Sequence, residues 1–203
     1  MDARDRAGGL KPDEPGREFR GGLVLGEERG DSVEIVPYDG TWPSRYQEMR
    51  RRLAEALGSV ARRIEHVGST AVPGLAAKPV VDIQLSVGDI DDEAAYRRSL
   101  EGLGFGLRYR KPYWRYFRPV PGVPRDCQVH VCQSGGKWER DHLLFRDYLR
   151  AHPDRAAAYA ALKRDLSLRY AQDRIGYTDA KAPFIKETLS QAEAWAAQTG
   201  WSP

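Results

Sequence analysis

The segment VVDIQLSV, residues 80–87, constrains the fold more than any other part of the chain. Its residues fall into two alternating sets, apolar Val81, Ile83, Leu85 and Val87 and polar Asp82, Gln84 and Ser86. A period of two indicates a β-strand, because successive side chains of a strand point to opposite faces. The segment therefore predicts a strand with one face in the core, and with Asp82 and Gln84 projecting together from the other face, away from the core.

The segment DCQVHVCQ, residues 126–133, follows the same rule. Its two valines are expected to face inward, and Gln128 and His130 then lie on the polar face. Cys127 and Cys132 are an odd number of positions apart, so they are expected on opposite faces, which disfavours a disulfide between them. Their spacing is not that of a zinc site.

Apolar residues recur at helical spacing elsewhere in the chain. The predicted helices cover residues 41–58, 138–152 and 153–170. Another begins at residue 89 and ends near Gly102 or Gly104, and a last helix begins after Thr178. Further strands are predicted at residues 64–67, 105–110 and 113–120. Because strands and helices are partly segregated along the chain, the sequence predicts an α+β fold, a mixed sheet flanked by helices with a helical C-terminal part.

The length of 203 residues suits one domain, which we place at residues 32–199. Residues 1–31 mix charge, glycine and proline without periodicity and predict a flexible N-terminal segment. No apolar run approaches the roughly 20 residues that span a bilayer, and no signal peptide is evident, so we expect a cytoplasmic protein without a membrane partner. The net charge of +3 is too small to indicate a nucleic-acid partner, and we expect none. The sequence does not indicate the oligomeric state.

Chemistry is concentrated in the stretch that precedes residues 80–87. Gly68 and Ser69, followed by Thr70, end the strand before it. A glycine there lets backbone N–H groups approach an anion, and the serine hydroxyl adds a donor. Asp82 on the next strand is the type of residue that holds Mg²⁺, which in turn neutralises nucleotide phosphates. Each signal is weak alone, and the two together are moderately specific for a nucleotide site.

Four segments extend these signals to most of the chain: PYDGTWPSRY, IEHVGSTAVPGLAAKPVVDIQL, HVCQSGGKWERDHLLFRDYLRAHP and YTDAKAPFI. With them the chain resembles the GrpB family over roughly residues 33–190. That family is similar to the polymerase-β-type nucleotidyltransferase superfamily, whose members carry a Gly-Ser turn and then an Asp-x-Asp strand. The resemblance implies a metal-dependent nucleotidyltransferase that moves an NMP group from an NTP to a small-molecule acceptor. It implies Mg²⁺ or Mn²⁺ as cofactor, Gly68 and Ser69 as the phosphate-gripping turn, and Asp82 as the first metal-binding carboxylate.

The chain departs from that pattern at Gln84, where the superfamily usually supplies a second acid. A glutamine carbonyl can coordinate Mg²⁺ but adds no negative charge. Superfamily members normally supply a third acid from a later strand, and in this chain His130 occupies the corresponding position. Its imidazole suits Mn²⁺ or Zn²⁺ better than Mg²⁺. The predicted metal set is therefore Asp82, Gln84 and His130. Two alternatives remain: an altered metal site, or a non-catalytic nucleotide- or metabolite-binding module with a degenerate one.

Glu65 and His66 precede the Gly-Ser pair and are further catalytic candidates. In an alternating strand they lie on opposite faces, so only one of them can face the site. Glu65 would replace the missing acid, and His66, like His130, would serve as a base or a ligand. The alternative is a hydrogen-bonded strand pair that holds the turn.

Three basic residues complete the predicted phosphate-binding set. Lys78 can meet a phosphate as a point charge, or it is a solvated loop lysine. Arg115 lies among aromatic residues, which suits a nucleotide surface and equally an aromatic-covered sheet edge. Lys181 is expected in the first turn of a helix, where it opposes the helix dipole and suggests a nearby anion. Arg146 and Asp147 are adjacent on a helix and are expected not to face each other, with Arg146 the better substrate contact.

Overall fold

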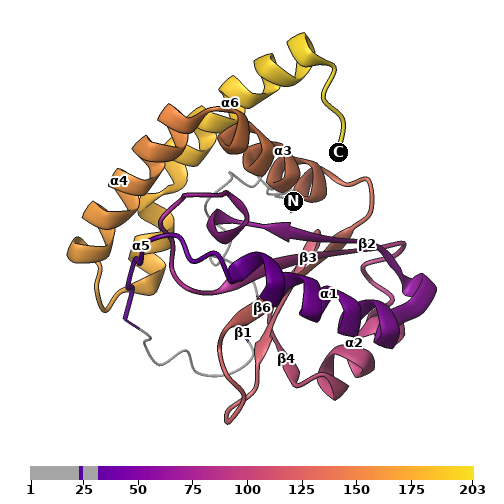
Figure 1. The fold of residues 1–203 in the computed structure, drawn as a ribbon. Coiled ribbons are helices and arrows are strands. Elements are labelled where there is room, and N and C mark those ends of the chain that lie inside the picture. Colours follow the sequence, from indigo (N-terminus) through magenta and orange to yellow (C-terminus); the bar gives the residue numbers. More distant parts are fainter. Residues whose placement is uncertain (1–22, 25–31) are drawn as a thin grey trace, which may run out of the picture.

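A mixed sheet forms the centre of the molecule (Figure 1), a computed structural model that describes residues 23–24 and 32–203. Six strands run in the order β1-β4-β5-β6-β3-β2. Their bounds are Leu23–Val24 for β1, Ala61–Val67 for β2, Val81–Val87 for β3, Phe105–Lys111 for β4, Trp114–Pro119 for β5 and Cys127–Gln133 for β6. β3 and β6 are parallel, and the other neighbouring strands are antiparallel. The predicted α+β class with a mixed sheet is confirmed.

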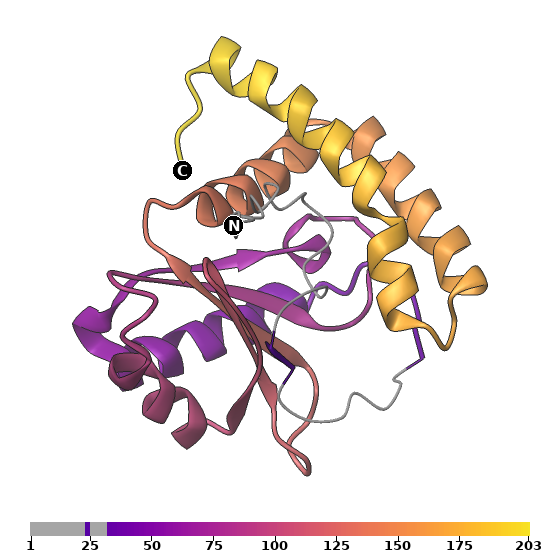
Figure 2. The ribbon, with the colours of Figure 1, turned by 180° about the vertical axis from the view of Figure 1, so that it is seen from behind.

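Helices cover both faces of this sheet. They are α1 (Trp42–Leu57), α2 (Glu93–Gly102), α3 (Lys137–Ala151), α4 (Pro153–Arg169), α5 (Arg174–Ala180) and α6 (Ala182–Thr199), with short 3-10 turns η1 (Gly58–Val60) and η2 (Ser69–Ala71). The helices α1 and α2 lie over one face, and α3 to α6 lie on the other side, as the front and back views show (Figure 1, Figure 2). The C-terminal part is therefore helical, as predicted.

The face toward α1 and α2 carries the main apolar core. The alternating apolar residues of β3 pack there, together with Val129 and Val131 of β6. Trp42 and Leu53 of α1 are fully buried against them. The period-two prediction for both strands is confirmed, and Cys127 and Cys132 lie in different clusters on the two faces.

The opposite face of β3 is also buried, which corrects the expectation that its polar residues project away from the core. Gln84 and Ser86 have 0% exposed surface. Gln84 lies in register between Glu65 of β2 and His130 of β6. Both neighbours contact α3, through Arg146 and Trp138 respectively, so α3 closes this part of the face.

The helical part differs from prediction at one boundary. The predicted break at residues 152–153 is confirmed, because α3 ends at Ala151 and α4 begins at Pro153, which is favourable at a first helical position. The helix expected to begin after Thr178 is instead two helices, with Thr178 inside α5 and Lys181 between α5 and α6. The side chain of Asp173 accepts a hydrogen bond from the Gly176 amide and starts α5.

The prediction for residues 1–31 falls outside the described residues, apart from Leu23–Val24, which pairs with β4. The boundary at residue 32 stays a prediction. Within residues 32–203, no helix combines the length and the apolar character needed to cross a bilayer.

Candidate functional site

The turn after β2 and the start of β3 meet at Gly68 and Asp82. Val67 pairs with Asp82 across the two strands, and Gly68 follows with φ +71°. A Cβ atom on Gly68 would lie 2.5 Å from Oδ2 of Asp82. Glycine is therefore required here both by its positive φ and by the closeness of the carboxylate. The predicted convergence of the Gly-Ser turn with the aspartate is present in the structure.

A cavity of about 580 Å³ opens at this point, within the size range of small-molecule sites. Its floor is the end of the sheet, and its walls come from the loop before β3 and from α3 to α6. The cavity brings together these predicted site residues: Gly68, Ser69, Thr70, Lys78, Asp82, His130 and Lys181. The predicted residues Glu65, His66, Gln84 and Arg115 do not line it.

The carboxylate of Asp82 is held on one side. Gln128 Nε2 donates a short hydrogen bond to Oδ1, and His130 Nε2 lies 3.1 Å from the same oxygen. Burial acts to raise the pKa of Asp82, but the hydrogen bonds from His130 and Gln128 outweigh it and hold the pKa below its ordinary value. Asp82 is therefore ionised at neutral pH, with Oδ1 engaged by the sheet and Oδ2 directed to the turn.

The tautomer of His130 follows from its contact with Trp114. The indole Nε1 of Trp114 lies 3.0 Å from His130 Nδ1, and an indole N–H can only donate. Nδ1 is therefore an acceptor, the proton is on Nε2, and Nε2 donates to Asp82. Both ring nitrogens are engaged, so the geometry does not support His130 as a metal ligand or a general base. The hydrogen bond from His130 Nε2 instead orients the carboxylate of Asp82.

Gln84 does not join Asp82 in the cavity. Its side chain is fully buried, and neither amide atom has a hydrogen-bond partner among the described residues. Across residues 32–203, no group of three or more His, Cys, Asp or Glu side chains could hold a metal ion. Two carboxylates line the cavity, Asp82 and Asp141, and Asp141 is paired with Lys137 at 2.5 Å. The residues present therefore do not fit a resident Mg²⁺ or Mn²⁺ site, which normally uses several oxygen ligands.

Glu65 and His66 lie on opposite faces of β2, as predicted. Glu65 Oε2 accepts a hydrogen bond at 2.8 Å from Arg146 of α3. His66 stacks on Tyr46 with ring centroids 4.9 Å apart, and its Nε2 lies 2.9 Å from Thr70 Oγ1. Burial lowers the pKa of His66 to about 4, and the charges of nearby arginines act in the same direction. The arrangement supports the alternative in which this pair holds the turn.

The three predicted phosphate-binding cations separate into two groups. Arg115 is 5% exposed and lies on the α2 side, where it donates to Glu93 at 2.6 Å and to Asp91 at 2.8 Å. Arg115 pairs with Val131 of β6 on the face toward α1 and α2, so its side chain does not reach the cavity on the opposite face. Lys78 and Lys181 do line the cavity.

Arg146 and Asp147 of α3 pair directly, contrary to the expectation from their adjacent positions. Arg146 Nε donates to Asp147 Oδ1 at 2.8 Å, and Nη2 lies 3.1 Å from Oδ2. The rule that residues i and i+1 of a helix do not face each other applies to side chains that extend straight from the helix. The long side chain of Arg146 instead folds back, so that its guanidinium reaches Asp147. Arg146 does not line the cavity, so its predicted substrate contact has no support in the structure.

Lys163 of α4 was not predicted as a site residue from the sequence. Its side chain is 2% exposed, its Nζ donates to the carbonyl of Ala76, and it lines the cavity. Burial lowers its pKa to about 7, with smaller contributions from the charges of Lys181 and Arg164. The available signal was its position four residues after Tyr159, which places it on the inner face of an otherwise apolar helix surface.

An aromatic wall was also missed. Trp138 and His142 of α3 stack with centroids 3.6 Å apart, and both line the cavity. Tyr159 and Tyr177 line it from α4 and α5. The cavity therefore combines cationic groups with flat aromatic side chains.

The fold and the site define an α+β domain with a cavity between the end of its sheet and a helical lobe. The family model described as GrpB protein matches residues 32–191. The chain belongs to the GrpB family. The resemblance seen in the sequence is confirmed.

Individual relatives agree with this membership. A UPF0157 protein from Streptomyces coelicolor is 42% identical over 171 residues, which cover 84% of this chain and 90% of the relative. The crystal structure of the conserved protein GrpB from Enterococcus faecalis superposes with a TM-score of 0.72 at 30% identity, covering 80% of this chain and 99% of that chain. A dephospho-CoA kinase from Mycolicibacterium paratuberculosis is 36% identical over 200 residues, covering 84% of this chain and 48% of that relative.

Proposed function

We propose that the protein binds a nucleotide, most simply a nucleoside triphosphate, in the cavity at the end of the sheet. The observation that carries this proposal is the convergence of the Gly68 turn, the ionised Asp82 and the lysines on one cavity.

The charges of the cavity favour a ligand with phosphate groups. Lys78, Lys163 and Lys181 line it, and Asp82 is an opposing carboxylate. Gly68 and Ser69 also line it, and the backbone amides of a glycine turn are donors suited to an anion. Lys163 is nearly fully buried and forms no ion pair with the described residues, so a bound phosphate would supply a direct anionic partner for its ammonium.

The aromatic wall favours a ligand that also has a flat ring. Trp138, His142 and Tyr177 line the same cavity as the lysines. Aromatic side chains bind flat ring systems by stacking. Together the two features support a nucleotide over inorganic phosphate. The relative named dephospho-CoA kinase makes dephospho-CoA a reasonable ligand to test, although this chain matches only 48% of that protein.

Nucleotidyl transfer to a small-molecule acceptor is the second candidate function. Its support is Asp82, whose Oδ2 faces the turn and can accept a hydrogen bond from an acceptor hydroxyl. In such a reaction the acceptor oxygen attacks the α-phosphorus and pyrophosphate leaves, and the cavity lysines would offset the charge that develops. The buried Gln84, in place of a second carboxylate, is the reason that we rank binding above transfer.

Calorimetric titration tests both candidates. ATP, GTP, CTP and dephospho-CoA are titrated into the protein with and without Mg²⁺ or Mn²⁺. We expect at least one of them to bind, and Lys163→Met to weaken that binding about tenfold, the equivalent of about 1.4 kcal/mol. Lys186→Met, a lysine that does not line the cavity, is the matched control. Failure of every ligand to bind at millimolar concentration would overturn the proposal.

The metal dependence separates the two candidates. Binding that strengthens with a divalent ion and weakens in Asp82→Asn, together with pyrophosphate release, supports transfer. Binding that ignores the ion supports the binding module.

A further inference from the structure

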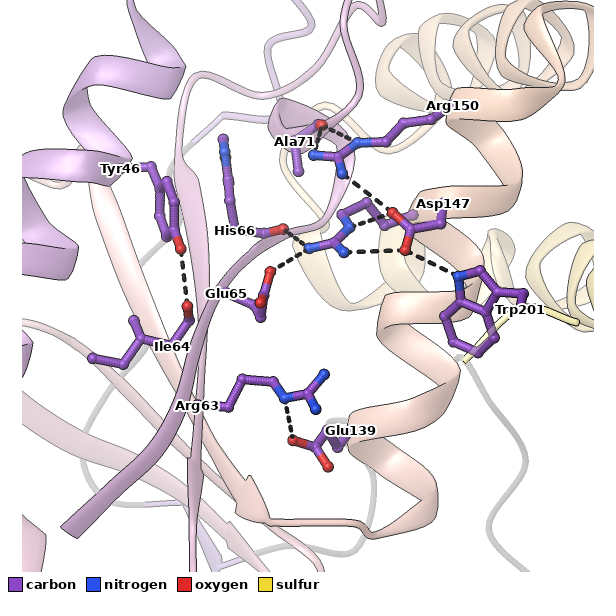
Figure 3. Close-up of polar contacts among 11 residues, drawn as sticks. Tyr46, Arg63, Ile64, Glu65, His66, Ala71, Glu139, Asp147, Arg150 and Trp201 are labelled. Atoms are coloured by element: carbon purple, nitrogen blue, oxygen red, sulfur yellow. Dashed lines mark hydrogen bonds and ion pairs between the residues drawn. The ribbon is translucent and has the colours of Figure 1, made fainter. Parts of the chain in front are cut away.

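Two arginines of α3 hold the chain on both sides of the 68–70 turn (Figure 3). Before the turn, Arg146 Nη1 donates to the carbonyl of His66 at 3.0 Å. After the turn, Arg150 donates to the carbonyl of Ala71 from Nε at 3.0 Å and from Nη2 at 2.8 Å. Both ends of the turn are therefore bonded to one helix.

Asp147 fixes the two guanidinium groups relative to each other. Besides its two bonds from Arg146, it accepts one from Arg150 Nη1 at 3.2 Å. The indole Nε1 of Trp201, after the end of α6, lies 3.2 Å from its Oδ2 (Figure 3). Burial acts to raise the pKa of Asp147, but the hydrogen bonds and the charge of Arg146 outweigh burial and hold the pKa below its ordinary value. The carboxylate is therefore charged at neutral pH.

The turn has little rigidity of its own. Within it, the amides of Ala71 and Val72 donate to the carbonyls of Gly68 and Ser69, each at 3.2 Å. These are 3-10 bonds, whose geometry is weaker than that of an α-helix. Gly68 is also the residue type with the greatest backbone freedom. Its ordered shape therefore depends on bonds from outside the turn.

We propose that Arg146 and Arg150 are positioning residues that clamp the 68–70 turn in its ligand-binding shape, with Asp147 and Trp201 holding the clamp. The ligand part of this inference rests on the proposed function. A turn that binds through backbone amides gains affinity when it is ordered in advance, because less conformational entropy is lost on binding.

The test combines amide exchange in the turn with nucleotide titration. Arg150→Lys keeps the charge but replaces a forked donor pair by a single ammonium. We expect exchange at the Ala71 and Val72 amides to become about tenfold faster, and the dissociation constant of the best-binding nucleotide to rise about tenfold. Arg146→Lys is expected to act in the same direction.

A graded variant and a control complete the design. Trp201→Phe removes only one donor to Asp147, so we expect a two- to threefold effect and an intact fold. Arg155→Lys alters a partly buried arginine that bonds Thr188 and pairs with Glu187 of α6 rather than the turn, and it is expected to leave both measurements unchanged.

The outcomes distinguish this inference from the proposed function. Unchanged exchange at Ala71 and Val72 in folded Arg150→Lys, Arg146→Lys and Trp201→Phe would overturn the clamp, whatever the protein binds. Faster exchange in these variants supports the clamp even if the wild type binds no nucleotide, a result that overturns the proposed function alone.

Discussion

The two faces of the sheet are built from the same alternating strands but are completed in different ways. On the face toward α1 and α2, aliphatic side chains of β3 and β6 pack against helix residues such as Trp42 and Leu53. On the face toward α3, polar side chains such as Glu65 and Gln84 lie beside a buried aromatic cluster that includes Trp114, and ion pairs and hydrogen bonds connect this face to the helix. Apolar packing closes most of the first face, and the buried Arg115–Glu93 ion pair lies on its α2 side. The second face carries the cavity, to which we assign the proposed function.

Removing apolar volume from the closed face should have the largest effect. Leu85 is fully buried in the main core, so Leu85→Ala should lower the free energy of unfolding by about 3–4 kcal/mol through lost burial and a residual cavity. Ser86→Ala, the neighbouring residue on the α3 face, is the matched control and should cost less than about 1.5 kcal/mol, because it loses one weak contact to the Cys132 thiol. Urea unfolding measures both. Equal losses would remove the proposed difference between the faces.

A titratable residue on the closed face should make stability depend on pH. The pKa of His66 is lowered to about 4 in the folded protein, below its unfolded value. The unfolded state then binds more protons between pH 6.5 and pH 4, so stability falls as the pH falls through this window. The contribution of His66 is about 3 kcal/mol between pH 7 and pH 4.

His66→Gln carries no titrating ring and should have a flatter pH profile in thermal or urea unfolding. Parallel profiles for the wild type and this variant would show that His66 is not buried in its neutral form.

The unpaired glutamine on the polar face predicts a gain of stability. Both amide atoms of Gln84 are buried without hydrogen-bond partners among the described residues. Gln84→Met keeps a similar shape and removes the desolvation cost of the amide, so the free energy of unfolding should rise by about 1–2 kcal/mol. A loss of stability would indicate that the amide has a polar partner, such as a buried water molecule.

The smallest expected effect concerns the turn hydroxyl. Ser69→Ala removes one donor at the cavity and leaves the backbone amides in place. We expect nucleotide affinity to fall about fivefold, the equivalent of about 1 kcal/mol, with unfolding unchanged. Thr188→Ser, a buried hydroxyl of α6 outside the cavity, serves as the control for a small hydroxyl change and should retain full affinity.

Much of the architecture was predictable because it depends on local periodicity. The alternation in β3 and β6 identified their core faces, and Pro153 marked the boundary between α3 and α4. The boundary near Lys181 was missed because α5 is short and its start depends on the cap at Asp173, a single side-chain bond. Short helices carry too few periodic positions for their ends to be recognised.

The candidate site was predictable only in part. The contact between Gly68 and Asp82 follows from two adjacent strands joined by one loop, so sequence distance was a fair guide. Lys163 and the Trp114–His130 hydrogen bond join residues from separate elements, and no spacing rule connects them. Arg115 was assigned to the site from its aromatic neighbours, although strand parity places it with Glu93 on the other face.

By itself the sequence determined the alternation of the strands, the glycine turn and the membership of the GrpB family, because these depend on residue order over short distances. The tertiary structure decided which polar groups share the cavity, which ring nitrogen of His130 carries the proton, and that Gln84 is enclosed beneath α3. The physical reason is that burial and hydrogen bonding depend on what packs against a side chain, and here that neighbour comes from helices distant in the chain.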